Sequence, residues 1–295
     1  MASEAAAPRR SAGHRLAGLF QGRPRLQVGA LLAAPGAWLV VLYLGSLALL
    51  LITAFWTVDP LSGAVEKGFS LENFDALFNE PVYRDIVWRT VRTAALVTLT
   101  DAIIAFPIAF YMAKVASRRA KAILVVAVLM PLWSSYLVKI LSWRTMLSED
   151  GVINWALDPI GLHGPGYGLT AVWLVLSYLW LPYMILPIYA GLERIPNSLI
   201  SASEDLGASP FTTFRRVIFP LAFPAVVAGS IFTFSLSLGD YITPRLVSNS
   251  QFIGNTIASS ITNDLPFAAA LALIPIVVMI AYLSVARKLG AFEHV

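Results

Sequence analysis

The chain has 295 residues, of which 58% are hydrophobic and only 13% are charged, about half the charged share of an ordinary soluble domain. The net charge is +4 and Cys is absent, which excludes disulfides, thiol catalysis and thiolate metal sites. A mean hydropathy of +0.73 excludes a soluble globular protein. We therefore expect an all-α, multi-pass protein of the cell (plasma or inner) membrane with six transmembrane helices, in contact with membrane lipid.

The three His residues (His14, His163 and His294) lie far apart in terminal or loop segments, so we expect no metal site. The basic residues follow the expected membrane topology, and the positive charge therefore does not predict nucleic-acid binding. No cofactor is predicted in the chain itself.

The first part of the chain is predicted to hold an arm, one helix and a loop. Residues 1–28 are rich in Ala, Gly, Pro and Arg, and we expect a flexible cytoplasmic arm near anionic lipid. The first transmembrane helix is predicted over 29–58, where the uncharged stretch 35–58 is too long for a signal peptide. Residues 59–88 are expected to form an extracytoplasmic loop with a short surface helix in FSLENFDALF, capped by Ser70.

Five further apolar stretches form a predicted five-helix core over 89–290. They lie at 93–113, 122–142, 169–192, 221–239 and 266–286. Prolines inside these stretches predict kinked helices that can open a cavity, and they are Pro107, Pro131, Pro182 and Pro187. Fourteen Lys and Arg residues fall on one side of the predicted spans and six on the other, so both termini are expected to be cytoplasmic.

The connection between the fourth and fifth spans, residues 193–224, is too long and too patterned for a plain turn. Asn197 or Ser198 can cap a short helix through LISASEDL, and Gly207 can end it. Ser209 can cap a second helix, with Pro210 at its first position. The pair is expected to present apolar side chains to water, as a docking site does. These side chains are Leu199, Leu206, Phe211 and Phe214. The alternative is an ordinary amphipathic connector.

This segment resembles the EAA loop of binding-protein-dependent ABC importer permeases, whose pattern is E-A-A-x-x-x-G, nine residues, then I-x-L-P. Gly207 and Pro220 stand at the required separation, and Ala202 fills the first Ala position. Ser201 stands where the family has Glu, and Ser203 where it has the second Ala. The resemblance implies that residues 193–220 form a cytoplasmic loop that couples the chain to a separate ATPase. The coupling residues are Ser201, Ala202, Ser203, Glu204, Asp205, Leu206, Gly207, Ala208, Ser209, Pro210, Phe211 and Pro220.

Further matches cover roughly residues 31–288 and are most similar to the first membrane subunit of spermidine/putrescine-type permeases. They include FPIAFYMAK (106–114), PLWSSYLVKILSW (131–143) and IGNTI (253–257). The resemblance implies the type I ABC importer permease fold. It implies three partners: a second permease subunit of a different chain, two copies of a cytoplasmic ABC ATPase that hold ATP and Mg²⁺, and an extracytoplasmic substrate-binding protein. Opine, phosphonate and other importers share these segments.

Several polar and aromatic residues in the spans are candidates for a translocation pathway: Asp101, Asp240, Tyr241, Lys139 and Trp143. A carboxylate or an aromatic face can stabilise an ammonium group. Asp101 can instead hydrogen-bond through Thr98 or Thr100, or lie near enough to one end to be solvated. Lys139 can snorkel to the interface and is assigned a structural or gating role first. Asp240 and Tyr241 can also belong to an interfacial belt.

The leading hypothesis is a permease subunit of an ATP-driven importer for polyamine or a related cationic small molecule, working by alternating access. The chain lacks G-x-x-x-x-G-K-[ST], so it is not predicted to hydrolyse ATP and is not predicted to be an enzyme. The alternative is a stand-alone secondary transporter or channel subunit, with Asp101 as the ion-coupling carboxylate. A membrane enzyme or scaffold has no positive residue evidence.

Overall fold

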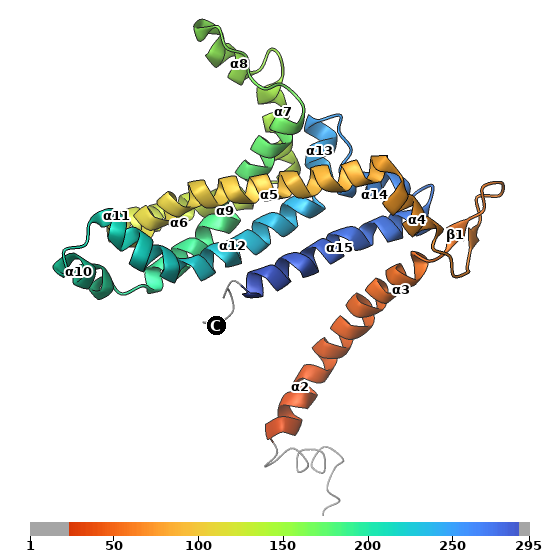
Figure 1. The fold of residues 1–295 in the computed structure, drawn as a ribbon, viewed down its shortest axis with the longest axis horizontal. Coiled ribbons are helices and arrows are strands. Elements are labelled where there is room, and N and C mark those ends of the chain that lie inside the picture. The colour runs from red at the N-terminus through yellow and green to blue at the C-terminus, as the bar shows by residue number, and fades with distance from the viewer. Residues whose placement is uncertain (1–23, 289–295) are drawn as a thin grey trace, which may run out of the picture. The chain divides into compact units, whose positions relative to one another are not determined.

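The computed structural model describes residues 24–288, which are mostly helical (Figure 1). The chain divides into two compact units, Met1–Thr53 and Ala54–Val295. Residues 1–23, most of the expected cytoplasmic arm, lie outside the described residues. Each unit is described by itself below.

In the first unit, α2 (Pro24–Trp38), the π-helical segment η1 (Leu39–Leu44) and α3 (Gly45–Thr53) follow one another without a gap. Residues Leu31–Thr53 are long and apolar enough to cross a membrane. The helix begins at Pro24, so residues 24–28 are helical and do not belong to a flexible arm. It ends at Thr53, a few residues before the expected end at 58.

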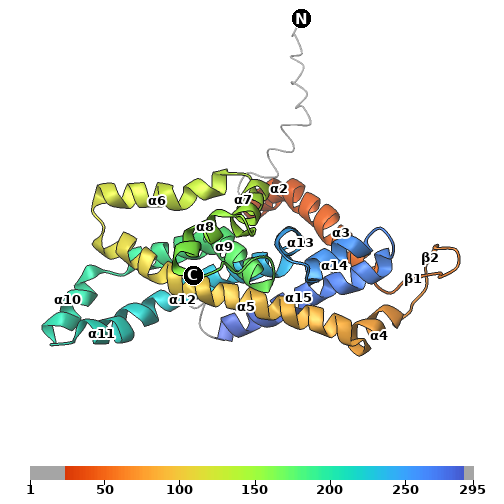
Figure 2. The same cartoon turned by 90° about the horizontal axis from the view of Figure 1, so that it is seen from above.

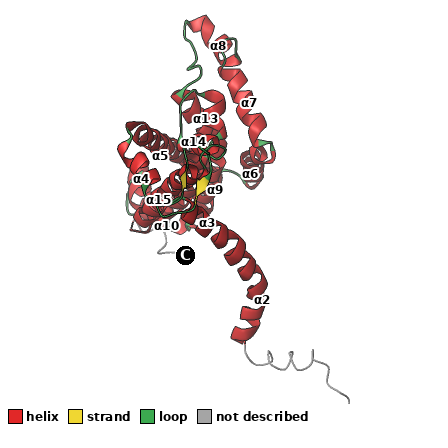
Figure 3. Ribbon diagram, turned by 90° about the vertical axis from the view of Figure 1, so that its right-hand side faces the viewer, coloured by secondary structure: helices red, strands yellow, loops and turns green. Residues whose placement is uncertain are grey.

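The second unit opens with a small hairpin and a short helix. Strand β1 (Thr57–Val58) pairs antiparallel with β2 (Val65–Glu66), and these strands are drawn in yellow in Figure 3. The helix expected in FSLENFDALF is present as α4 (Glu72–Asn79), where the Ser70 hydroxyl accepts from the backbone N–H of Glu72 at 3.2 Å. The Asn73 amide donates to the carbonyls of Ala54 and Trp56 at 3.0 and 2.8 Å. This polar side chain therefore fastens the helix to the start of the unit.

The described part of the second unit contains four long helices (Figures 1 and 2). They are α5 (Pro81–Phe110, continued by the π-helical η2, Tyr111–Val115), α9 (Leu169–Arg194), α12 (Phe219–Gly239) and α15 (Leu265–Lys288). Helices α5, α9 and α12 pack against one another through buried faces that are mostly apolar. Gly191 lets α9 and α12 approach closely, because a Cβ there would overlap the methyl group of Ala225.

The third predicted span is not a single helix. It forms α6 (Arg118–Trp133) and α7 (Tyr136–Leu147), which meet at 92°. Ser134 is extended between them, and the carbonyl of Pro131 accepts from the Ser134 hydroxyl at 2.8 Å and from Lys139 Nζ at 3.1 Å. The Ser134 backbone N–H also donates to this carbonyl, at 3.4 Å, so three donors satisfy the end of α6 at the break.

Shorter elements connect the long helices. They are α8 (Val152–Leu157), the 3₁₀ turn η3 (Asp158–Ile160), α10 (Asn197–Asp205), α11 (Pro210–Thr213), the π-helical η4 (Phe214–Ile218), α13 (Ile242–Val247) and α14 (Ile253–Ser260). Figure 1 shows α10 and α11 at one end of α5, which we call the coupling end, and α4 and α14 at the other, the far end. The described residues contain five helices able to span a membrane by length and composition, or six if α6 and α7 form one bent span.

Candidate functional site

The segment 193–220, here the coupling segment, forms two short helices joined by a tight glycine turn. Helix α10 begins at Asn197 with Pro196 in the cap position, so neither Asn197 nor Ser198 caps it as expected. Gly207 has a positive φ of 75°. The N–H of Gly207 donates to the Glu204 carbonyl at 2.8 Å, and that of Ala208 to the Ser203 carbonyl at 3.1 Å. This pair of bonds is the Schellman arrangement that closes a helix on glycine.

The second short helix starts as the sequence predicts. The Ser209 hydroxyl accepts from the backbone N–H of Thr212 at 3.3 Å, and Pro210 occupies the first turn. Between the two helices, the hydroxyls of Ser203 and Thr213 are 2.9 Å apart. Ser203 replaces the second Ala of the EAA pattern, and its hydroxyl braces α10 against α11. The departure from the pattern thus adds a contact inside the segment.

The coupling segment exposes apolar side chains at its tip. Leu206 is 88% exposed and Phe211 is 70% exposed, and Leu199 is also exposed. Phe214 was expected beside them but is turned inward, where its ring packs edge-on against Phe106 at 5.5 Å. Ser201, Ala202, Glu204 and Asp205 are exposed on α10. The surface left for a partner is therefore apolar at the turn and polar along α10.

Two lysines, one from η2 and one from the first turn of α6, hold the root of this segment. Lys114 Nζ donates to the Ile195 carbonyl at 2.6 Å and to Asn197 Oδ1 at 3.1 Å. Lys121 Nζ forms an ion pair with Glu193 Oε1 at 2.8 Å. An ammonium group at the last carbonyls of α9 is favourable because helix C-termini carry partial negative charge. The motif FPIAFYMAK contains Lys114, but nothing in its spacing indicated this contact.

Asp101 lies inside the helix bundle rather than at a solvated end. Its exposure is 0%, and both carboxylate oxygens lack a hydrogen-bond partner among the described residues. The bonds expected through its neighbours do not form, since Thr98 donates to the Ala94 carbonyl and Thr100 accepts from Trp173. The hydroxyls of Ser177 and Ser237 are likewise buried without a partner. Asp101 is thus enclosed in the structure described.

Asp240 is the centre of a hydrogen-bond network at the end of α12. Its Oδ2 accepts from the hydroxyls of Tyr136 at 2.5 Å and Thr243 at 2.8 Å. Its Oδ1 accepts from the backbone N–H groups of Ile242 and Thr243, both at 3.0 Å. The carboxylate therefore ties α7 to the start of α13 and has no free oxygen in this conformation. Sequence reasoning missed Tyr136, which lies 104 residues away along the chain.

The remaining pathway candidates differ in exposure. Tyr241 is exposed beside Asp240. Trp143 packs on Tyr178 with ring centroids 5.5 Å apart. Lys139 is bonded to the Pro131 carbonyl at the α6–α7 break, which is a structural contact of the kind expected for it. The structure therefore gathers Asp240 and Tyr241 at one place and leaves Asp101 enclosed elsewhere in the bundle.

Comparison with known proteins identifies the family. The family described as "Binding-protein-dependent transport system inner membrane component" matches residues 86–290, which include the coupling segment. The chain belongs to this family. It is an ABC importer permease subunit and a multi-pass protein of the inner membrane. Family membership supports the permease subunit of an ABC importer and not a stand-alone transporter or channel.

Two curated relatives cover most of the permease. The inner membrane ABC transporter permease protein YdcU of Escherichia coli (strain K12) is 43% identical over 297 residues, 95% of each chain. The spermidine/putrescine transport system permease protein PotB of Haemophilus influenzae is 31% identical over 245 residues, 80% of this chain and 85% of the relative.

Solved structures show the same fold at low identity. A chain of the bacterial alginate ABC transporter, in complex with an alginate pentasaccharide-bound periplasmic protein, has a TM-score of 0.73 at 17% identity, over 90% of this permease and 94% of that chain. A chain of the inward-facing MetNI methionine ABC transporter has a TM-score of 0.55 at 19% identity, over 72% of this permease and 98% of that chain. The permease thus has the type I ABC importer fold.

Proposed function

We propose that this permease imports a polyamine, such as spermidine or putrescine, or a related cationic small molecule, by alternating access. The observation that carries the proposal is the 31% identity to a PotB protein over 80% of the chain. YdcU, at 43% identity, is named only as a permease and does not narrow the substrate. Support for a cationic solute therefore comes from the PotB relative alone.

The proposed partners follow from the coupling segment. Its exposed Leu206 and Phe211 offer an apolar surface that a cytoplasmic ABC ATPase can cover, and that ATPase would hold ATP and Mg²⁺. The excess of Lys and Arg on the side of the coupling segment supports its position in the cytoplasm. A substrate-binding protein would then deliver solute at the far end, and a second permease subunit of a different chain would complete the pathway.

We place the pathway of this permease beside Asp240 and Tyr241, near its mouth at the far end. Tyr241 offers an exposed aromatic face to an ammonium group, and the Asp240 carboxylate supplies negative charge directly beside it. Asp240 can reach a solute only if Tyr136 releases it, so solute contact and movement of α7 are linked in this proposal. Trp143 and Lys139 lie on the same helix, α7, and Asp101 is the candidate deeper in the bundle.

The proposal is tested with the complete complex in proteoliposomes. The permease, its second permease subunit and the ATPase are reconstituted with ATP inside, and the binding protein and labelled spermidine are added outside. We expect uptake that needs all four proteins, together with ATP hydrolysis that the loaded binding protein stimulates. Calorimetry of the binding protein with spermidine, putrescine and neutral or anionic solutes identifies the substrate. ATP hydrolysis that is stimulated only by a non-cationic ligand would contradict the polyamine proposal. It would still agree with an ATP-driven importer.

A further inference from the structure

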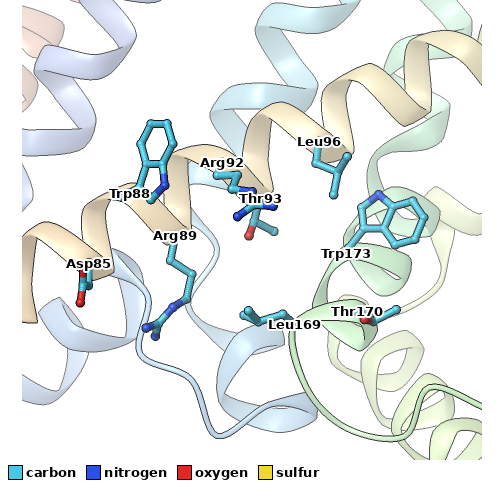
Figure 4. Close-up of a pocket in the computed structure, with 9 residues that line it drawn as sticks. All are labelled: Asp85, Trp88, Arg89, Arg92, Thr93, Leu96, Leu169, Thr170 and Trp173. Atoms are coloured by element: carbon cyan, nitrogen blue, oxygen red, sulfur yellow. The ribbon is translucent and has the colours of Figure 1, made fainter.

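A cavity of about 370 Å³ lies between the N-terminal half of α5 and the start of α9, away from the coupling segment (Figure 4). Helix α5 contributes Arg89, Arg92 and Leu96 to its wall, and α9 contributes Leu169 and Trp173. Figure 4 shows the Arg89 guanidinium extending from α5 beside the loop that precedes α14, with Leu169 across the opening. The importer mechanism described above uses none of these residues.

The charges around this cavity favour an anion. Neither Arg89 nor Arg92 forms an ion pair within the described part of the chain, and Asp85 is the one carboxylate in the wall. Arg89 donates one hydrogen bond, to the Gln251 carbonyl at 3.0 Å, which leaves most of its N–H groups free. The Trp173 indole N–H is already bonded to Thr100. The charged donors in the wall are therefore guanidinium groups, which match phosphate oxygens in charge and geometry, and the wall also holds the Trp88 indole and the Thr93 and Thr170 hydroxyls.

An exposed apolar stripe continues along α5 from the cavity toward the coupling end. Leu96 lines the cavity, and Leu99 and Ile103 follow at helical spacing with exposures of 59% and 64%. The rise from Arg92 to Ile103 is about 16 Å, which is close to half of a hydrocarbon core about 30 Å thick. The stripe therefore has the length of one lipid leaflet. Trp88, at the same level as the two arginines, is exposed as interfacial tryptophans are.

We propose that an anionic phospholipid binds at this place, with its phosphate at Arg89 and Arg92 and an acyl chain along Leu96, Leu99 and Ile103. Two unpaired cations attract a phosphate, and the adjoining stripe is apolar over the length of an acyl chain. A small soluble anion would use only the arginines. A second permease subunit that covered this face would have to pair or solvate both guanidinium groups. The proposal does not depend on the identity of the transported solute.

The test measures how much phosphatidylglycerol the purified complex retains compared with phosphatidylcholine. The complex is extracted in detergent, exchanged into nanodiscs with an equal mixture of the two lipids, re-extracted, and its bound lipid is counted by mass spectrometry. The test variant is the double substitution Arg89→Gln and Arg92→Gln. Arg84→Gln is the matched control, because Arg84 is an exposed arginine of the same helix outside the cavity. A double Arg→Lys variant keeps the charge at both positions.

We expect the wild type, Arg84→Gln and the Lys variant to prefer phosphatidylglycerol, and the double Gln variant to lose about 30-fold in that preference. Equal retention by the double Gln variant and the wild type would overturn the proposal. Glycerol 3-phosphate in detergent provides a second arm. If glycerol 3-phosphate raises the temperature at which the purified complex unfolds as much as phosphatidylglycerol does, the site binds a free anion. The proposed acyl-chain contact would then be wrong. Cross-linking of Leu99 to the second permease subunit, with no lipid retained, would assign the stripe to that subunit instead.

Discussion

Gly207 illustrates how one residue shapes the coupling segment. Its φ of 75° is a conformation in which residues with a Cβ are strained, and both closing hydrogen bonds of α10 depend on it. A Cβ at this position would meet nothing within 4 Å. Any substitution effect therefore comes from the backbone and not from a steric clash with a neighbour.

We predict that Gly207→Val weakens ATPase docking and abolishes uptake while membrane insertion stays intact. A β-branched side chain in the left-handed region costs about 1–2 kcal/mol and shifts the turn that separates the two short helices. Co-purification of the ATPase with the tagged permease measures docking, and membrane fractionation measures insertion. Gly207→Asn is the control, because Asn tolerates this conformation, and it should retain most activity. Normal uptake by the Val variant would refute the role given to the turn.

Asp240 gives the second prediction at the residue scale. Asp240→Asn removes the negative charge but keeps one carbonyl oxygen for the backbone bonds to α13, so the complex should still assemble. We expect uptake of spermidine to fall about tenfold, as for one lost charge contact of about 1.4 kcal/mol, and uptake of a neutral solute to change less. Initial uptake rates in proteoliposomes measure both.

Two variants bracket that result. Asp158→Asn changes an exposed carboxylate in the turn after α8 and should leave uptake unchanged. Asp101→Asn tests the deeper, fully enclosed carboxylate. Unchanged uptake in the Asp240 and Asp101 variants together would leave the pathway without a cation site and would favour a non-cationic substrate.

At the scale of elements, the coupling segment is fastened to the rest of the permease through its root. Lys114 reaches the last carbonyl of the α9 cap and the first residue of α10, and Lys121 pairs with Glu193 one turn earlier. Lys114 lies in η2, which continues α5, and Lys121 lies in the first turn of α6. A displacement of α10 is therefore transmitted to α5 through side chains as well as through the backbone of α9.

We predict that Lys114→Ala uncouples ATP hydrolysis from uptake. The docking surface at Leu206 and Phe211 is untouched, so hydrolysis should stay within about twofold. Uptake should fall about tenfold, because hydrogen bonds to a charged group contribute about 1.5–3 kcal/mol. The ratio of ATP hydrolysed to solute imported is the measurement. Arg119→Ala, at an exposed residue of the first turn of α6, is the control, and Lys114→Arg should restore coupling in part. Parallel loss of both activities would show a docking defect instead.

Across the whole molecule, apolar length predicts some helices closely and others poorly. The fourth span, expected at 169–192, is α9 at Leu169–Arg194, because the helix and the apolar stretch end together. Helix α5 begins at Pro81, well before residue 93, since charged residues outside the membrane continue a helix as readily as apolar ones. The α6–α7 break was missed because a proline predicts a kink, whereas the 92° turn also needs Ser134 and Lys139 to satisfy the freed carbonyl.

The candidate site divides in the same way. The glycine turn and the Ser209 cap were predictable, because their signals are local in the sequence. The partners of Asp240 and Glu193 were not, because Tyr136 and Lys121 lie far away along the chain and meet them only in the folded bundle. In the sequence, Arg89 and Arg92 contribute only to the count of basic residues that predicts the membrane topology. The fold brings both of them to one cavity.

The composition of the whole complex is the last prediction. An ATPase dimer that closes on ATP offers two docking grooves, and this chain has a single coupling segment among its described residues. We therefore expect two membrane chains of different sequence with two ATPase copies. Native mass spectrometry of the complex, purified through a tag on this permease, measures the stoichiometry. A complex with one membrane chain and one ATPase would contradict the prediction.

Two π-helical segments, η2 beside the coupling segment and η4 within it, have a mechanical consequence. In η2 the N–H of Ala116 reaches the Tyr111 carbonyl, and in η4 the N–H of Phe219 reaches the Phe214 carbonyl, so each turn holds one residue more than an α-helical turn. If the extra residue moved along the helix, the adjoining stretch would shift by about 1.5 Å and rotate by about 100°. Only a few hydrogen bonds would be exchanged at a time. The end of α5 and the start of α12 therefore each contain a turn with one extra residue. This extra residue lets the coupling segment move while both helices stay hydrogen-bonded.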